Sequence, residues 1–247
     1  YYQLPGAYFP HSAYPTEMNI MPYWVPTWAW EICETPWTVQ SLWWHFLYTQ
    51  DEDFLRNRAF GPITEAVKFL VAYMMRPQAS AGATTNDSNR ERAGDAPVPP
   101  LDGKFHIFPT VPPELYGLQD RWDKNYDCIV DLTLTKFVFN AYLSASDRLA
   151  AGDAELAGNI RTILSRFPDY PTADSPAGKV FVSVPGESPD MIMNVPNGNM
   201  SVFPGEDVGL HSSPETLQTA INTHRNSQNE GGNDLVFRHL QGARAEG

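Results

Sequence analysis

The strongest candidate for chemistry in this chain is a single carboxylic acid, Glu114, in a proline-rich segment that leads into a strongly apolar stretch. Pro109, Pro112 and Pro113 fix their own φ angles and push the preceding residues toward extended backbone, so the segment has little freedom. The apolar residues around it predict a segment pinned inward, where poor solvation would favour the protonated form of the acid. Such an acid suits the cleavage of glycosidic bonds. The alternative is a proline-rich connector with an exposed glutamate.

Other kinds of catalytic chemistry lack their sequence patterns. The six histidines are scattered without an HxxxH spacing, and the two cysteines form no CxxC, so we expect no zinc and no other metal. The chain has no GxSxG, P-loop or GxGxxG motif, which disfavours serine hydrolase, phosphate-cradling and dinucleotide sites. The segment NVPNGNM is interpreted as a turn. We therefore expect no cofactor.

Aromatic side chains dominate the beginning of the chain. Residues 1–34 combine tyrosine, tryptophan and phenylalanine with several prolines and match neither a helix nor a strand pattern. Rings of this kind either pack on a core or line a cleft, where they stack on sugar rings. The next segment is expected to be a helix that presents further candidates on one face: Trp37, Gln40, Trp44 and His45. Trp37 and His45 are the stronger candidates for the wall of a cleft.

The amino-acid composition restricts which kinds of partner the protein can bind. The formal net charge of -12 over 247 residues leaves no basic stripe for nucleic acid and disfavours an anionic membrane surface. No apolar run has the length of a membrane span. The chain begins at Tyr1 without methionine, so we expect an excised piece of a secreted or periplasmic protein. Cys33 and Cys128 are expected to be two buried thiols, although a disulfide between them stays open.

The periodicity of apolar residues predicts three helical hairpins in a single domain, residues 1–247. Thr35, Asp51, Asp153 and Ser213 are expected to cap or open helices. The predicted helices cover residues 35–50, 51–76, 127–149, 153–167, 213–228 and 235 onward. A short strand is possible at FVSV, and residues 78–102 are interpreted as an exposed flexible insertion. This organisation predicts an all-α fold, an (α/α) toroid that is an incomplete (α/α)6 barrel with long irregular loops on one face.

The segment TPWTVQSLWWHFLYTQDEDFLRNRAFGPITEAVKFLVAYM resembles a helical hairpin in the toroid catalytic domain of glycoside hydrolase family 95. Trp37, the Trp44-His45-Phe46 run and the acidic turn from Asp51 to Leu55 match the pattern of that family. Members of the family act mainly on α-L-fucosides and α-L-galactosides. The likeness extends over roughly residues 14–150.

The resemblance also suggests roles for single residues. Pro112-Pro113-Glu114 lies where the family has Ser-Pro-Glu, whose glutamate is the general acid. Asp127 corresponds to an aspartate that begins the next helix, and it is interpreted either as a second catalytic or sugar-binding carboxylate or as a buried, hydrogen-bonded residue at the start of that helix. Asn19 is the residue nearest to the paired asparagines that position water in the family, although their register is not preserved. The catalytic aspartate of the family would fall beyond the end of this chain. Further candidates for binding sugar hydroxyls are Asn125, His211 and Asn229.

Three hypotheses follow. The first is an inverting glycoside hydrolase in which Glu114 protonates the leaving oxygen and a second carboxylate, about 6.5–9.5 Å away, delivers water. The second is a helical scaffold that binds carbohydrate without catalysis. The third is a polysaccharide lyase, which would need a tyrosine or histidine base and a cation beside a uronate, and the acidic composition disfavours it.

Overall fold

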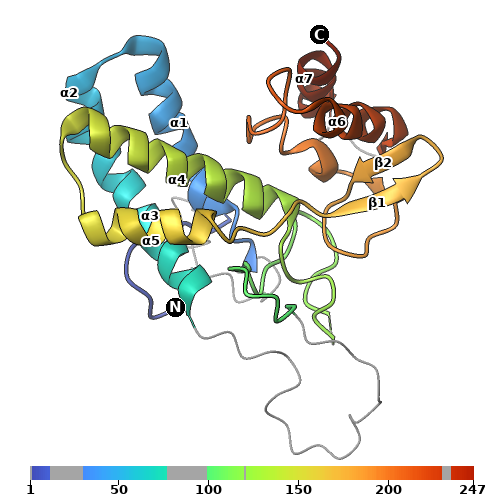
Figure 1. Ribbon diagram of the computed structural model, residues 1–247, viewed down its shortest axis with the longest axis horizontal. Coiled ribbons are helices and arrows are strands. Elements are labelled where there is room, and N and C mark those ends of the chain that lie inside the picture. Colours follow the sequence, from blue (N-terminus) through green and yellow to red (C-terminus); the bar gives the residue numbers. More distant parts are fainter. Residues whose placement is uncertain (1, 12–29, 77–98, 120, 230–234) are drawn as a thin grey trace, which may run out of the picture.

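The computed structural model describes residues 2–11, 30–76, 99–119, 121–229 and 235–247. Figure 1 shows a mostly helical molecule in which α1–α5 form one group and α6 and α7 lie beside it over a small hairpin of strands. The all-α class is therefore confirmed, with short strands as additions. Most of the predicted insertion, residues 78–102, and Asn19 lie outside the described residues. None of the described helices combines the length and the apolar character that crossing a membrane requires.

The first helical pair begins with α1 (Glu34–Thr49) and returns through α2 (Glu52–Phe54), a π-helical turn (Leu55–Ala59) and α3 (Phe60–Met75). Asp51 caps the return as predicted, because its side chain accepts a hydrogen bond from the backbone N–H of Phe54 at 2.9 Å. The expectation that Thr35 caps α1 is wrong. The helix begins one residue earlier, and the Thr35 hydroxyl instead accepts from the N–H of Phe9 at 3.1 Å.

The second pair is α4 (Ile129–Leu149) and α5 (Ala154–Leu164). The Asp153 carboxylate accepts hydrogen bonds from the N–H groups of Glu155 and Leu156, which confirms it as the cap of α5. Helix α4 crosses both α1 and α3, and its apolar side joins the largest core cluster of the molecule. The long loop before α4 is therefore anchored at a helix that touches most of the fold.

The third pair follows an antiparallel hairpin of β1 (Thr172–Ser175) and β2 (Gly178–Phe181). A 3-10 turn (Asn197–Asn199) and β3 (Ile192–Met193) precede α6 (Pro214–Asn226), β4 (Gln228–Asn229) and α7 (Leu235–Glu246). Strand β3 pairs in parallel with β4, and α6 packs against β2. Ser213 caps α6 by accepting from the N–H of Thr216 at 3.2 Å, as the sequence predicted.

Both cysteines are free and fully buried, in agreement with the expectation of two buried thiols. They share a core cluster with Val130, Leu134 and Met200, and this cluster lies between α1, α4 and the segment that precedes α6. Trp37 and Tyr116 pack on the same cluster. The N-terminal ends of α1 and α4 thus meet the proline-rich loop at one place.

Candidate active site

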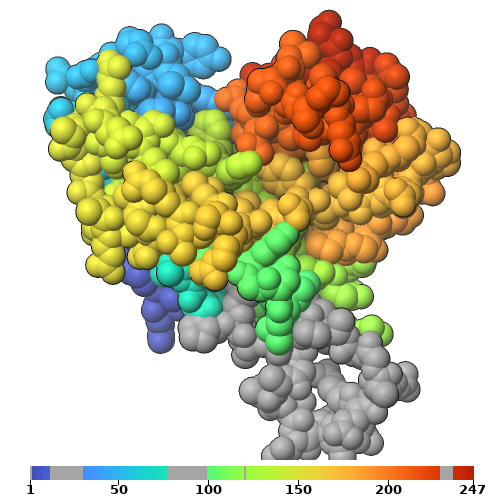
Figure 2. Space-filling model, in the orientation of Figure 1, coloured from blue at the N-terminus to red at the C-terminus, as the bar shows by residue number. Residues whose placement is uncertain are grey.

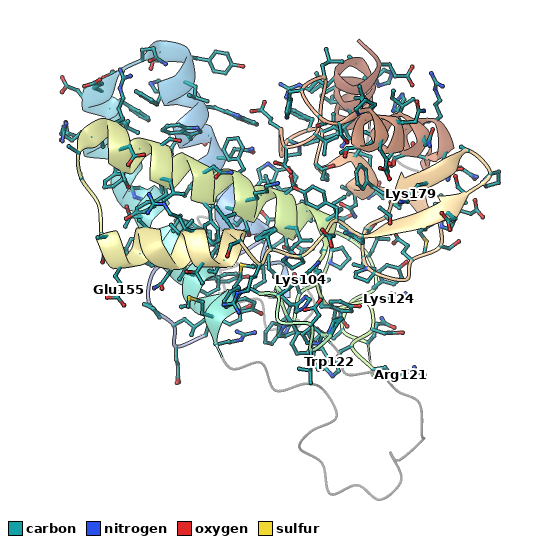
Figure 3. The ribbon with its side chains drawn as sticks, viewed as in Figure 1. Lys104, Arg121, Trp122, Lys124, Glu155 and Lys179 are labelled. Atoms are coloured by element: carbon teal, nitrogen blue, oxygen red, sulfur yellow. The ribbon has the colours of Figure 1, made fainter. Side chains whose placement is uncertain are left out.

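The loop that carries Glu114 is pinned by backbone and side-chain hydrogen bonds. Val111 donates to the carbonyl of Trp30 at 3.0 Å, and Thr110 donates its N–H to the carbonyl of Asn125 at 2.8 Å. The Tyr73 hydroxyl of α3 donates to the carbonyl of Pro109 at 2.6 Å. The predicted stiffness of the segment is therefore confirmed, since its backbone is tied both to the first helical pair and to itself. Figure 3 labels Trp122 and Lys124 near the lower end of this loop.

Glu114 is exposed, so the expectation of a poorly solvated side chain is wrong. The prolines before it are buried, and the carbonyl of Pro113 accepts from Asn197 Nδ2 at 2.7 Å. The side chain itself projects outward, where Asn194 Nδ2 donates to its Oε2 at 2.7 Å. The apolar neighbours fix the backbone rather than covering the carboxyl. Glu114 is consequently a precisely anchored acid that a ligand can reach.

A buried acid, Glu31, lies close enough to Glu114 for their charges to interact, and a half-buried acid, Glu34, lies beside Glu31. Glu31 has no exposed surface, and its burial, together with the negative charge of Glu114, raises the pKa of its carboxyl to about 8. Glu34, in the first turn of α1, has a pKa raised to about 7 by burial and then by Glu31. The ring nitrogen Nδ1 of His11 is hydrogen-bonded to Glu31 and lies 3.7 Å from Glu34 Oε1. Glu31 and Glu34 therefore keep their protons at pH values where ordinary carboxyl groups are ionised.

A fourth acid, Asp131, lies beneath the loop in the first turn of α4. It is fully buried, and this burial raises the pKa of its carboxyl well above the usual value although Thr110 Oγ1 donates to its Oδ2 at 2.5 Å. The negative charge of Glu31 acts in the same direction. Asp131 and Glu31 therefore belong to one electrostatically coupled set under the loop that carries Glu114.

The sequence predicted no metal site, but one group of residues has the right atoms. Ligand atoms of His11, Glu31 and Glu34 lie within 4.8 Å of one another. An imidazole and two carboxylates are donors that a divalent cation accepts. The direct hydrogen bond between His11 and Glu31 explains their closeness without an ion, and the chemistry below does not use one.

Asp127 holds the base of the loop. It is buried, its Oδ2 lies 2.5 Å from His106 Nδ1, and its Oδ1 accepts from the N–H of Ile107 at 3.0 Å. Burial lowers the pKa of His106, but the hydrogen bonds and charges of Asp127 and Asp102 outweigh this and raise it. With both oxygens engaged inside the protein, Asp127 positions the loop at its junction with α4.

Asn125 closes the turn of the loop in a similar way. Its side-chain amide donates to the carbonyls of Thr110 and Gly117 at 3.1 and 2.7 Å, and its Oδ1 accepts from the N–H of Gln119 at 2.7 Å. The residue is fully buried. These bonds stabilise the shape of the loop, and they leave the amide no exposed edge for a sugar hydroxyl.

The four candidates on α1 do not share one surface. Trp37 is half-buried near the loop, with its ring edge-on to Phe237 at 5.9 Å. Gln40 is buried and donates from Nε2 to the carbonyl of Pro204 at 2.7 Å. Of the four, Trp37 is therefore the one that shares a core cluster with the loop through Tyr116.

Trp44 and His45 lie farther along the helix. The Trp44 ring is stacked with Phe203 at 6.2 Å, and its Nε1 donates to Glu206 Oε2 at 3.2 Å. His45 is exposed and lies against Phe54, with ring centres 4.0 Å apart. At 1.5 Å per residue, Trp44 lies about 10 Å along the axis from Trp37. Phe237 and Phe203 are in ring contact at 5.5 Å, so Trp37, Gln40 and Trp44 face one region of the segment before α6 and α7, whereas His45 lies apart from it.

The remaining candidates lie elsewhere. His211 is exposed, and its Nε2 is 3.3 Å from the carbonyl oxygen of Asp207. Asn229 forms part of β4, but its side chain lies outside the described residues, as does all of Asn19. None of these three is brought to Glu114 by the described part of the structure.

Sequence reasoning missed two buried acids that interact with the loop or with Glu114 and the amide that reaches Glu114. Glu31 stands in the run WAWEICE, where an acid among large apolar residues is a signal of burial. Glu187 is also buried; it accepts from the Tyr116 hydroxyl at 2.8 Å, and burial raises the pKa of its carboxyl. Asn194 carried no signal, because it reaches Glu114 from 80 positions away in the sequence.

Most glycoside hydrolases act with a pair of carboxyl groups, and Glu114 and Glu31 lie close enough here for their charges to interact. The glycosyl hydrolase family 95 catalytic domain matches residues 1–180, and the chain belongs to this family. Alpha-L-fucosidase 2 of Arabidopsis thaliana is 22% identical over 196 residues, which cover 79% of this chain and 21% of the relative. The chain therefore spans about a fifth of the length of that curated protein.

Proposed function

We propose that this chain forms part of an inverting glycoside hydrolase that acts on α-L-fucoside or α-galactoside linkages, with Glu114 as the general acid. Family membership and the position of Glu114 after two prolines support this assignment. In this proposal the three helical pairs are part of an (α/α)6 toroid, and the enzyme is exported to meet its oligo- or polysaccharide substrate.

The observation that carries the proposal is the combination of an exposed carboxyl with a fixed backbone. Glu114 follows buried prolines whose last carbonyl is hydrogen-bonded to Asn197, and its carboxyl is oriented by Asn194. A general acid has to approach the leaving oxygen within hydrogen-bond distance, and small displacements cost large factors in rate. An exposed and oriented side chain satisfies this requirement.

The buried acids supply the electrostatic setting. Cleavage of a glycosidic bond passes through an oxocarbenium-like state that carries positive charge on the sugar. Glu31 adds negative charge near Glu114 as it loses its proton near pH 8, and Glu34 adds charge beside Glu31 as it loses its proton near pH 7. Such charge stabilises the developing cation more than the neutral substrate.

One observation favours the second hypothesis, a carbohydrate-binding scaffold without catalysis. Glu114 is exposed and its carboxyl accepts a hydrogen bond from Asn194, an arrangement that also suits a side chain that binds sugar hydroxyls without transferring a proton. The two hypotheses differ in whether bound sugar is turned over.

The decisive experiment compares Glu114→Gln with the parent protein. Loss of the acid is expected to lower kcat by about 10²–10⁴-fold on a fucosyl disaccharide and by less on an aryl α-L-fucoside, whose leaving group needs less protonation. Proton NMR of the first-formed sugar anomer reports inversion. Glu155→Gln is the matched control, because Glu155 is exposed on α5, away from the loop (Figure 3). Equal turnover by Glu114→Gln and the control would remove Glu114 from the mechanism, and sugar binding without turnover by the parent would support the scaffold.

A further inference from the structure

A second hollow of the molecule lies away from the Glu114 loop. Figure 2 shows the surface indented between α1, in blue, and the orange segment before α6, with α4 at the base of the indentation. A cavity of about 160 Å³ lies here, lined by Trp43 of α1, a stripe of α4 and residues 205–207. This volume is roughly ten times what one water molecule needs. At 1.5 Å per residue, Trp43 is about 13 Å along α1 from Glu34, which separates this cavity from the acid cluster.

The stripe on α4 has the spacing of one helix face. Phe137, Asn140, Ala141 and Ser144 follow one another at intervals of three, one and three residues, so they point to the same side. Asn140 and Ser144 are exposed, and neither side chain has a hydrogen-bond partner among the described residues. The face thus offers an amide and a hydroxyl one turn apart, beside the rings of Phe137 and Trp43.

The opposite wall carries two carboxylates that are held in place. Asp207 Oδ2 accepts from Lys136 Nζ at 2.7 Å and from the Tyr170 hydroxyl at 2.8 Å. Glu206 accepts from Arg244 at Oε1, at 2.7 Å, and from Trp44 Nε1 at Oε2. A carboxylate has about four lone-pair sites, so each keeps acceptor capacity after these bonds. Groups fixed in this way bind a ligand with little loss of conformational entropy.

From this lining we infer that the cavity is a second carbohydrate-binding site, which takes one neutral pyranose unit separately from the Glu114 site. A pyranose ring has C–H groups that pack on aromatic rings and hydroxyls that need donors and acceptors in a plane around it. The cavity provides rings from Trp43 and Phe137, an amide and a hydroxyl from α4, and carboxylates that accept from sugar hydroxyls. Uronates and sulfated sugars are expected to bind more weakly in a protein of net charge -12, although Lys136 and Arg244 offset the charges of Asp207 and Glu206 locally.

The site is tested by NMR titration of the ¹⁵N-labelled chain. The probes are methyl α-L-fucopyranoside and methyl β-D-galactopyranoside, with sodium glucuronate as the charged comparison. At least one neutral sugar is expected to produce saturable shifts at the amides of Asn140, Ser144 and Gly205 at concentrations up to about 50 mM. Glucuronate is expected to shift these amides less than the neutral sugars do, and Glu114→Gln is expected to preserve the shifts.

The double variant Asn140→Ala/Ser144→Ala removes the two polar groups from α4. Alanine favours helix, so the fold is retained, and loss of two hydrogen bonds is expected to weaken binding at the Gly205 amide about tenfold. Ser41→Ala/Gln218→Ala is the matched control, since both positions are exposed on helices and lie outside the cavity. The inference is overturned if no neutral sugar shifts these amides, if glucuronate shifts them as strongly, or if the double variant binds like the control.

Discussion

At the scale of single residues, the site separates two properties that one acid was expected to combine. Glu114 has the exposure that contact with a substrate requires, whereas Glu31 has the burial that keeps a carboxyl protonated. The sequence showed which acid follows the prolines, because that pattern is local. It did not show that Asn194 reaches Glu114 or that His11 is hydrogen-bonded to Glu31, since these contacts depend on tertiary packing.

The raised pKa of Glu31 leads to a prediction about stability. In the unfolded chain this carboxyl ionises near pH 4.5, and in the folded protein it ionises near pH 8. Between these values the native state binds more protons than the unfolded state. The free energy of unfolding that the Glu31 carboxyl contributes therefore falls as pH rises. Glu31→Gln removes this titration. The free energy of unfolding of the variant relative to the parent is therefore expected to increase between pH 5 and pH 8, by an amount on the order of 2–4 kcal/mol.

Urea unfolding at several pH values measures this difference. Glu155→Gln provides the control, because it makes the same substitution at an exposed glutamate at the start of α5. A difference between Glu31→Gln and the parent that stays constant, or that decreases toward pH 8, would mean that Glu31 is ionised in the folded protein at neutral pH.

At the scale of elements, helix ends with a local cap were predictable and those set by tertiary contacts were not. Asp51, Asp153 and Ser213 each accept hydrogen bonds from N–H groups two or three residues ahead, so the sequence alone contains the interaction. Thr35 has the same chemistry, but its hydroxyl is hydrogen-bonded to Phe9, 26 positions away. The loop before α4 was correctly predicted to be stiff, and of the two interpretations of Asp127 the structure agrees with the buried, hydrogen-bonded one.

The role of Asp127 as an anchor predicts the effect of Asp127→Asn. Residue 127 has a φ of 48°, which asparagine tolerates, so the substitution changes the charge and leaves the backbone in place. Removing one partner of a buried ion pair is expected to lower the free energy of unfolding by about 3 kcal/mol. His106 has a raised pKa, so the stabilisation is present below pH 6.5 and is lost as pH rises through the folded pKa. The penalty is therefore largest at acidic pH.

Chemical denaturation at pH 6 and at pH 9 compares this variant with Asp123→Asn, at an exposed position of the same loop. The control is expected to unfold like the parent at both pH values. If Asp127→Asn is as stable as the control, the carboxylate does not anchor the loop, and a role in contact with substrate becomes the better interpretation.

At the scale of the whole molecule, the segment before α6 joins the helical groups. Gln40 of α1 donates to the carbonyl of Pro204, and Gln241 of α7 donates to the carbonyls of Phe203 and Pro196 at 3.0 and 3.3 Å. The segment therefore lies between helices that come from opposite ends of the chain, as Figure 1 also shows. The three helical pairs were predictable from apolar periodicity. The contact of residues 203–205 with α1 and α7 was not predictable, because a glutamine on a helix gives no signal of a partner more than 150 positions away.

Gly205, in the segment before α6, gives a prediction about how closely this segment approaches α4. A Cβ atom on Gly205 would lie 1.9 Å from Thr133 Oγ1 of α4 and 2.8 Å from the carbonyl oxygen of Met200. One of these neighbours is backbone, so the clash cannot be relieved by side-chain rotation alone. Gly205→Ala is expected to lower the free energy of unfolding by about 1–3 kcal/mol, the usual cost of overpacking.

Gly158→Ala is the matched comparison, because Gly158 lies within α5 and a Cβ there meets no atom within 4 Å. Replacing a glycine in an open helix position by alanine is expected to raise the free energy of unfolding by about 0.5–1 kcal/mol. The same substitution should therefore change stability in opposite directions at the two positions, as measured by urea unfolding at one pH. If Gly205→Ala also stabilises the protein, the contact between α4 and residues 200–205 is looser than the structure shows, and the helical groups are not held together by this segment.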